Sequence, residues 1–192
     1  MNPLLDFSSL PRYSEIKPEH VTPAIDELLR QCRAVAAQAA DVASPATWAA
    51  SVAPMEDANE QLSRAWGQVS HLHSVLDSPE LREVYNENLP KITQFYAELG
   101  QNLALFHKYK ALAASAEYAS LSPARKKIID NELRDFKLGG ADLPEDQKPR
   151  FMAIQEELSK LSAKFEENLL DATNAWSKFI EDEDELRGLP ED

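Results

Sequence analysis

The sequence predicts an all-α fold, a multi-helix bundle with one long helix near the carboxyl end. Alanine and leucine favour helices because ordering them costs little side-chain entropy. They number 26 and 24 among the 192 residues, against 18 for valine, isoleucine and threonine together. Only five glycines occur, fewer than the turns of a β-sheet protein need. Apolar residues recur at spacings of three and four along most of the chain, which is the period of an amphipathic helix.

Residues 1–21 are predicted to form an extended arm, and residues 22–181 a helical domain. Three prolines fall within the arm, and each lacks the backbone N–H that a continuous helix uses. Thr22 followed by Pro23 is typical of a helix start, because threonine can cap free N–H groups and proline suits the first helical position. The first helix is expected to bury the stripe Ile25, Leu28, Leu29, Cys32, Val35 and Ala39.

A serine followed by proline repeats this start signal three times, at Ser44-Pro45, Ser78-Pro79 and Ser122-Pro123. Pro90 is expected to split the helix that begins at Pro79. Gly139-Gly140 predicts a left-handed stop after the helix that begins at Pro123. The stripes expected to face the core are Met55, Ala58, Leu62, Ala65, Trp66, Val69, Leu72 and Leu76; Ile92, Phe95, Tyr96, Leu99, Leu103 and Phe106; and Ile128, Ile129, Leu133 and Phe136.

The longest helix is predicted between Pro144 and Glu181, because the apolar stripe is unbroken there. At 1.5 Å per residue it would measure roughly 50 Å, so it must pair with another long helix or join two lobes. Residues 182–192 are predicted to be an acidic linker. The stripe of the long helix, expected in the core, is Phe151, Ile154, Leu158, Leu161, Phe165, Leu169, Ala172, Trp176 and Ile180.

Charge and cysteine content limit the partners and the compartment. The net charge is −13, so phosphate backbones and anionic lipid headgroups would repel the domain, and we expect neither nucleic acid nor membrane as a partner. No run approaches the ~18 apolar residues that a membrane span needs. A single cysteine, Cys32, and a start without a signal-peptide pattern favour a cytoplasmic location.

The chain carries no recognisable catalytic or metal-binding motif. A helical zinc protease site needs two histidines four residues apart with glutamate after the first, and none of the four histidines has this spacing. His71 and His73 lie two apart, on different sides of a helix, and are expected to be solvated or capping residues. Cys32 lies on an apolar stripe and is expected to be a packed thiol. We therefore assign no catalytic residue and no metal ligand, and the substrate-binding residues are unknown.

Three other patterns have a structural and a functional interpretation. The basic run Arg125-Lys126-Lys127 could meet a partner, although a solvated face near Asp130 is favoured. The acidic run from Glu181 to Glu185 lacks the glycine and the ligand spacing of a calcium loop, which favours a solvated linker. The aromatic residues could line a peptide groove, but their helical spacing favours the core. They are Phe95, Tyr96, Phe106, Tyr109, Trp48, Trp66 and Trp176.

Several runs resemble one family in order and spacing. They are Asn2-Pro3-Leu4-Leu5; Ile16 to Val21 with Pro23-Ala24-Ile25; Val69-Ser70-His71-Leu72 leading to Ser78-Pro79-Glu80-Leu81-Arg82; Ile129 to Phe136; Gly140 to Pro144; and Leu169 to Thr173 with Trp176. Together they resemble the amino-terminal region of the thimet-oligopeptidase-like zinc peptidases over nearly the whole chain.

The resemblance implies the amino-terminal lobe of a clamshell-shaped, almost wholly helical peptidase that hydrolyses short unfolded peptides. It implies zinc in the full-length parent, held by a motif downstream of this chain, and the carboxyl-terminal catalytic region of the same polypeptide as partner. We expect this chain to be a fragment that walls the substrate channel and is inactive and zinc-free by itself. The alternative is a free-standing helical protein-interaction module without enzymatic activity.

Overall fold

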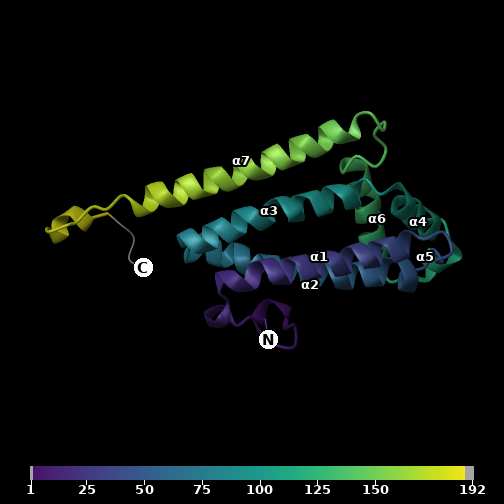
Figure 1. The fold of residues 1–192 in the computed structure, drawn as a ribbon, viewed down its shortest axis with the longest axis horizontal. Coiled ribbons are helices and arrows are strands. Elements are labelled where there is room, and N and C mark those ends of the chain that lie inside the picture. Colours follow the sequence, from purple (N-terminus) through teal and green to yellow (C-terminus); the bar gives the residue numbers. More distant parts are fainter. Residues whose placement is uncertain (1, 189–192) are drawn as a thin grey trace.

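The fold of residues 2–188, as described by a computed structural model, is all-α (Figure 1). The protein is 76% helical with no strand in this range, which confirms the predicted class. Short 3₁₀ turns lie at Pro3–Leu5, Tyr13–Glu15 and Glu183–Leu186, and a π-helical turn at Trp48–Val52. The helices are α1 (Pro18–Ala40), α2 (Ala53–Val75), α3 (Pro79–Gly100), α4 (Leu103–Ala113), α5 (Ala116–Ser120), α6 (Pro123–Leu138) and α7 (Lys148–Asn174).

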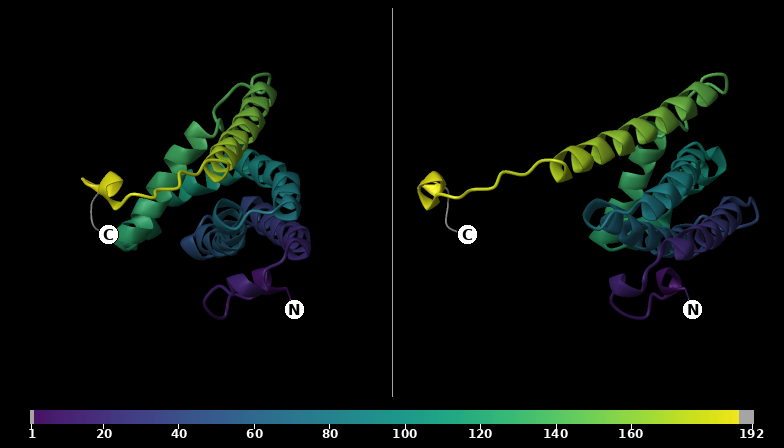
Figure 2. Two further views of the ribbon diagram at one scale, coloured as in Figure 1. Left: turned by 90° about the vertical axis from the view of Figure 1, so that its left-hand side faces the viewer. Right: turned by 60° about the vertical axis from the view of Figure 1, so that its left-hand side comes forward.

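Helices α1, α2 and α3 form the main bundle, with the amino-terminal arm against α1 and α2 (Figures 1 and 2). Their apolar stripes meet in a first core that includes Leu28, Leu62 and Phe95. At the other end of the bundle, α4 packs on α1 and on the turn before α2, and α6 packs on α4 and α3, forming a second core around Phe106, Tyr109 and Phe136. Most of the predicted stripes of these helices therefore face inward.

Two of the three serine–proline start signals are confirmed. The Ser78 hydroxyl accepts from the backbone N–H of Leu81, and the Ser122 hydroxyl accepts from that of Arg125. The predicted start at Ser44-Pro45 is wrong, because Thr47 caps the next helical segment instead. Its hydroxyl accepts from the N–H of Ala50 at 3.2 Å.

Two predicted helix boundaries are wrong because prolines lie inside helices. Helix α1 begins at Pro18 and contains Pro23, so the helical part of the chain starts four residues before Thr22. Helix α3 runs through Pro90 without a break. Each proline loses one backbone hydrogen bond, and the apolar faces buried on both sides of it hold the helix together.

The stripe expected to run from Ile92 to Phe106 is divided between two helices. Helix α3 ends at Gly100, and the side chain of Asn102 caps α4 by accepting from the N–H of Leu105. The stop at Gly139-Gly140 is confirmed. Gly140 has a φ of +90°, and the N–H of Ala141 donates to the carbonyl of Phe136, as in a Schellman motif.

Helices α3 and α6 approach closely at a pair of glycines. A Cβ atom added to Gly100 would lie 3.3 Å from the Cα of Gly139, and one added to Gly139 would lie 3.1 Å from the Cα of Gly100. These distances are shorter than ordinary van der Waals contacts of a Cβ atom, so a side chain at either position would require the neighbouring backbone to shift by a few tenths of an ångström. The chain reaches α7 at Lys148, nine residues after Gly139.

Helix α7 is the longest helix, as predicted, but it ends at Asn174 rather than near Glu181. It runs antiparallel to α3 and extends past the end of the bundle, and the chain then continues away from it (Figures 1 and 2). The prediction that Trp176 lies in the core is wrong, because this side chain is 73% exposed beyond the end of the helix.

The division into an arm, a helical domain and an acidic linker stays a prediction. Of the predicted linker 182–192, residues 189–192 lie outside the described part of the chain. The acidic residues before them are exposed, and several form the short 3₁₀ turn. Across residues 2–188, no helix has the length and apolar character that crossing a membrane requires.

Candidate functional site

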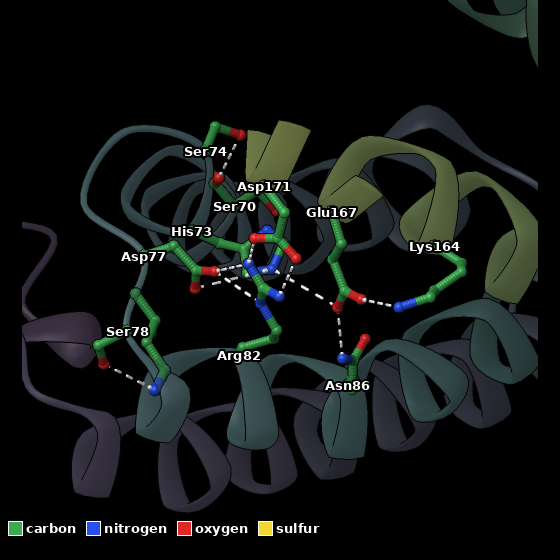
Figure 3. A network of polar contacts seen from close by, with 11 residues as sticks. Ser70, His73, Ser74, Asp77, Ser78, Arg82, Asn86, Lys164, Glu167 and Asp171 are labelled. Carbon is green, nitrogen blue, oxygen red and sulfur yellow. Dashed lines mark hydrogen bonds and ion pairs between the residues drawn. The ribbon is translucent and has the colours of Figure 1, made fainter. Parts of the chain in front are cut away.

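The most connected polar cluster lies where the end of α2 and the start of α3 meet the last turns of α7 (Figure 3). Arg82 of α3 is its centre. The Arg82 guanidinium donates through Nε to Asp77 at 2.7 Å, and through both terminal nitrogens to Asp171 of α7 at 2.9 and 2.7 Å. This bidentate pair joins the last turns of α7 to the first turn of α3.

The local sequence explains this position of Arg82. Ser78 caps α3, which begins at Pro79, so that Arg82 falls in the first turn. Asp77 lies in the two-residue connection before that cap, within reach of the Arg82 side chain. The arginine therefore meets one carboxylate from the connection and one, 89 positions later in the sequence, from α7.

His73 is buried against this cluster, which differs from the solvated or capping role expected for it. It is 4% exposed and its ring stacks on Tyr85, with centroids 4.1 Å apart. Its Nε2 atom lies 3.9 Å from Asp77 and 4.0 Å from Glu167, too far for a direct hydrogen bond with either. The imidazole fills the space between two carboxylates and an aromatic ring.

The other histidines match the expectation better. Nδ1 of His20 accepts from the backbone N–H of Lys17 at 3.1 Å, which caps the start of α1. His71 is exposed, and its ring lies 5.3 Å from that of Tyr13. His107 is exposed on α4.

A second part of the cluster continues along α7. Glu167 is buried, accepts from the side-chain amide of Asn86 at 2.6 Å and lies 3.5 Å from the Lys164 ammonium (Figure 3). Further along, the hydroxyls of Thr93 and Ser159 are 2.8 Å apart. The contact between α3 and α7 is therefore a ladder of polar pairs along both helices.

The charges of the cluster stabilise one another. Hydrogen bonds to Asp171 and Asp77 raise the pKa of Arg82, and the hydrogen bond from Arg82 lowers the pKa of Asp171. Burial raises the pKa of the neighbouring Tyr85 phenol. Arg82 and Asp171 therefore remain charged at neutral pH, and Tyr85 remains neutral.

An open pocket of about 610 Å³ borders the cluster and has Arg82 and Asp171 in its wall. A cation would meet the Arg82 guanidinium there, which opposes metal binding between Asp77 and Asp171. Among residues 2–188, no three histidine, cysteine, aspartate or glutamate side chains are grouped as metal ligands. The arrangement is suited to holding helices together, and it contains no nucleophile paired with a base.

The prediction that the apolar stripe of the longest helix lies in the core is wrong, because this opposite side of α7 is uncovered. Only Ala163 and Glu167 of this helix are buried. Phe165 is 68% exposed and Leu161 is 59% exposed, and both face away from α3. We call this surface the outer face of α7; its residues are Ile154, Leu158, Leu161, Phe165 and Leu169.

The remaining residues considered from the sequence are spread through the molecule. Cys32 is confirmed as a packed thiol: it is buried, its Sγ donates to the carbonyl of Ala58, and burial raises its pKa to about 11. Arg125 lies over the Trp48 ring, 4.8 Å from its centroid, so part of the basic run packs on an aromatic surface. Asp130 accepts from the Tyr118 hydroxyl rather than pairing with Lys126.

The sequence analysis missed the Arg82 cluster. Arg82 was part of a run used only for the resemblance, and Asp171 is far from it in sequence. One signal in the sequence could have indicated this cluster. Glu167 and Asp171 lie four residues apart, so they share a side of α7 away from its apolar stripe.

Comparison with known proteins identifies the family. Residues 25–148 match the family described as neurolysin/thimet oligopeptidase, N-terminal domain. The chain belongs to this family. It is 46% identical over 191 residues to oligopeptidase A of Haemophilus influenzae, and 41% identical over 190 residues to oligopeptidase A of Escherichia coli. These alignments cover 99% of this chain, which confirms the resemblance found in the sequence.

More distant members align along the same N-terminal region. A dipeptidyl carboxypeptidase of Salmonella typhimurium is 27% identical over 192 residues, or 98% of this chain. The chain spans 28% of the length of each of these relatives. It is therefore an N-terminal domain of the oligopeptidase A type, in a family whose members extend much further.

Proposed function

We propose that this domain is the amino-terminal helical lobe of a zinc-dependent oligopeptidase that hydrolyses short unfolded peptides. The observation that carries the proposal is the alignment of 99% of the chain with peptidases named oligopeptidase A. The helical architecture is compatible with a lobe that acts by its shape. In this role the domain walls the substrate channel, so that an extended peptide enters and a folded protein does not.

The chemistry is assigned to a part of the protein other than this domain. The described residues do not fit a zinc site, since they offer no convergent ligand set. We therefore propose that zinc is held by a carboxyl-terminal catalytic region, where it would supply an activated water for peptide hydrolysis. No residue of this domain takes part in bond cleavage in this proposal.

The proposed partners are short peptides and the catalytic region of the same polypeptide. The net charge of −13 disfavours nucleic acid and anionic membrane surfaces. A cytoplasmic location is proposed as well, because a buried cysteine without a partner for a disulfide suits a reducing compartment.

A free-standing interaction module is the second candidate. The outer face of α7 favours it, because exposed apolar surface on a helix is a common feature of protein-binding domains. The two candidates differ in the activity of the full-length gene product.

The test is a peptidase assay on an internally quenched peptide of about ten residues, with zinc analysis of the same sample. We expect the full-length protein to cleave the peptide, to lose activity with a chelator and to regain it with added zinc. The 192-residue chain should be inactive under all of these conditions. A full-length protein that neither cleaves peptides nor retains zinc after dialysis would favour the interaction module.

A further inference from the structure

Helix α7 turns its polar side toward α3 and leaves its apolar side uncovered. Its side-chain hydrogen bonds to α3, one of which is also an ion pair, are made by Ser159, Glu167 and Asp171. Of its side chains, Ala163 alone belongs to the first core. An amphipathic helix of a self-contained bundle has the reverse orientation, with its apolar stripe inward and its charges in water.

The apolar surface that this orientation leaves uncovered is long and continuous. The five side chains of the outer face recur every three or four residues over four turns. Trp176 and Phe179 continue the exposed apolar surface beyond the helix, with exposures of 73% and 86%. In Figures 1 and 2 no other element of residues 2–188 lies over this side of α7. Exposing so much contiguous apolar surface to water is unfavourable in free energy, and such a surface is typical of an interface.

The length of the relatives indicates what covers this face. The domain accounts for 28% of the matched relatives, so most of such a protein lies outside it and must contact it somewhere. Helix α7 is the last helix of the domain, and it projects past the bundle that carries it (Figure 1). It is thus the element best placed to reach a neighbouring part of the polypeptide.

Charge argues against a second copy of the domain as the occupant. Each copy carries a net charge of −13, so two copies repel each other electrostatically. The outer face itself is made of uncharged side chains, which offer no compensating pairs between copies.

We propose that the outer face of α7 is the docking surface for the catalytic region of the same polypeptide. The polar ladder fixes α7 on its own domain, and the apolar face receives apolar side chains of that region. The inference rests on the proposed function for the existence of this region, and it adds the surface through which the two parts are joined.

Cysteine labelling tests the proposal. Leu161→Cys and, separately, Phe165→Cys are made in the 192-residue chain and in the full-length protein, and the rate of maleimide labelling is measured. Native Cys32 contributes little background, because it is buried with a raised pKa. Lys127→Cys, at an exposed position of α6, is the control to which each rate is normalised.

We expect both outer-face cysteines to react quickly in the isolated chain and at least about tenfold more slowly, relative to the control, in the full-length protein. An unchanged ratio would overturn the proposal. Protection in the isolated chain that grows with its concentration would also overturn it, because a second copy would then be the occupant.

The labelling result is independent of activity. An inactive full-length protein with protected outer-face cysteines would retain the docking surface and defeat the peptidase proposal. An active full-length protein with fully reactive outer-face cysteines would support the peptidase proposal and overturn the docking surface.

Discussion

The α1–α2 contact and the α3–α7 contact join long helices by opposite means. Between α1 and α2, side chains such as Leu28 and Leu62 are buried in a shared core. Between α3 and α7, the contacts are a polar ladder that ends in the Arg82–Asp171 pair. The first contact gains stability by removing apolar surface from water, whereas the second mainly fixes orientation. The apolar stripe of a helix therefore does not show which of its sides will face its own bundle.

The largest difference is expected from truncating one leucine in each region. Leu62→Ala should lower the free energy of unfolding by about 2–5 kcal/mol, because it leaves a cavity in the first core. Leu161→Ala, on the outer face of α7, should change it by less than about 0.5 kcal/mol in the isolated chain. Urea denaturation of both variants measures the difference. Equal losses of unfolding free energy would contradict the assignment of Leu62 to a core and of Leu161 to an uncovered face.

The polar ladder should be sensitive to removal of its central arginine. Arg82→Ala takes both hydrogen bonds from Asp171 and leaves the nearly buried Asp77 without its partner. We expect amide hydrogen exchange in α7 to become at least about tenfold faster while exchange in α1 is unchanged. Arg134→Ala, which removes an exposed pair with the adjacent Asp135, is the control and should leave both helices as they are. Equal acceleration in α1 would show that α7 is not held separately.

A pH effect should arise near the second core. Burial, with Glu56 and Asp135 nearby, raises the pKa of Glu132 to about 7. An acid with a raised folded-state pKa holds its proton longer in the folded chain, so stability falls as pH rises from about 4.5 to about 7. Glu132→Gln should gain about 1 kcal/mol at pH 8, a value reduced for the partial exposure of this side chain, and gain nothing at pH 4.

Thermal unfolding of the wild type and Glu132→Gln at both pH values gives the comparison. Glu157→Gln, at an exposed position of α7, is the matched control and should have no pH-dependent effect. A gain that is equal at pH 4 and pH 8 would show that ionisation of Glu132 is not its cause.

The smallest effect is expected at Trp176. Since its ring is 73% exposed, Trp176→Ala should change the unfolding free energy of the isolated chain by less than about 0.5 kcal/mol. Intrinsic fluorescence of the wild type should also show a solvent-exposed contribution that the variant lacks. A loss of several kcal/mol would mean that the ring is buried after all.

The fold could largely be predicted from local patterns, because helix signals lie within short stretches. Ser78, Ser122 and Gly140 act on neighbouring backbone groups, and their roles follow from the sequence around them. The predictions based on Pro23, a helix start, and on Pro90, a helix break, were wrong. Tertiary packing of the buried apolar faces outweighs the one hydrogen bond that each proline removes.

The site could not be predicted in the same way. Arg82 and Asp171 are 89 positions apart, and their pairing depends on the path of α7 across α3. Trp176 was misplaced because α7 ends at Asn174, before this residue. The rest of the predicted stripe of α7 was misplaced because helical periodicity identifies a stripe without fixing the direction it faces. That direction is set by polar partners on another helix.

The crossing of Gly100 and Gly139 makes the spacing of α3 and α6 sensitive to a single methyl group. A Cβ atom at Gly139 would lie 3.1 Å from the Cα of Gly100, so one of the two backbones would have to shift by a few tenths of an ångström. Helix α7 begins nine residues after Gly139, and its last turns are joined to α3 by the Arg82–Asp171 pair. A shift of α6 would therefore reach α7 only through the connecting residues 139–147.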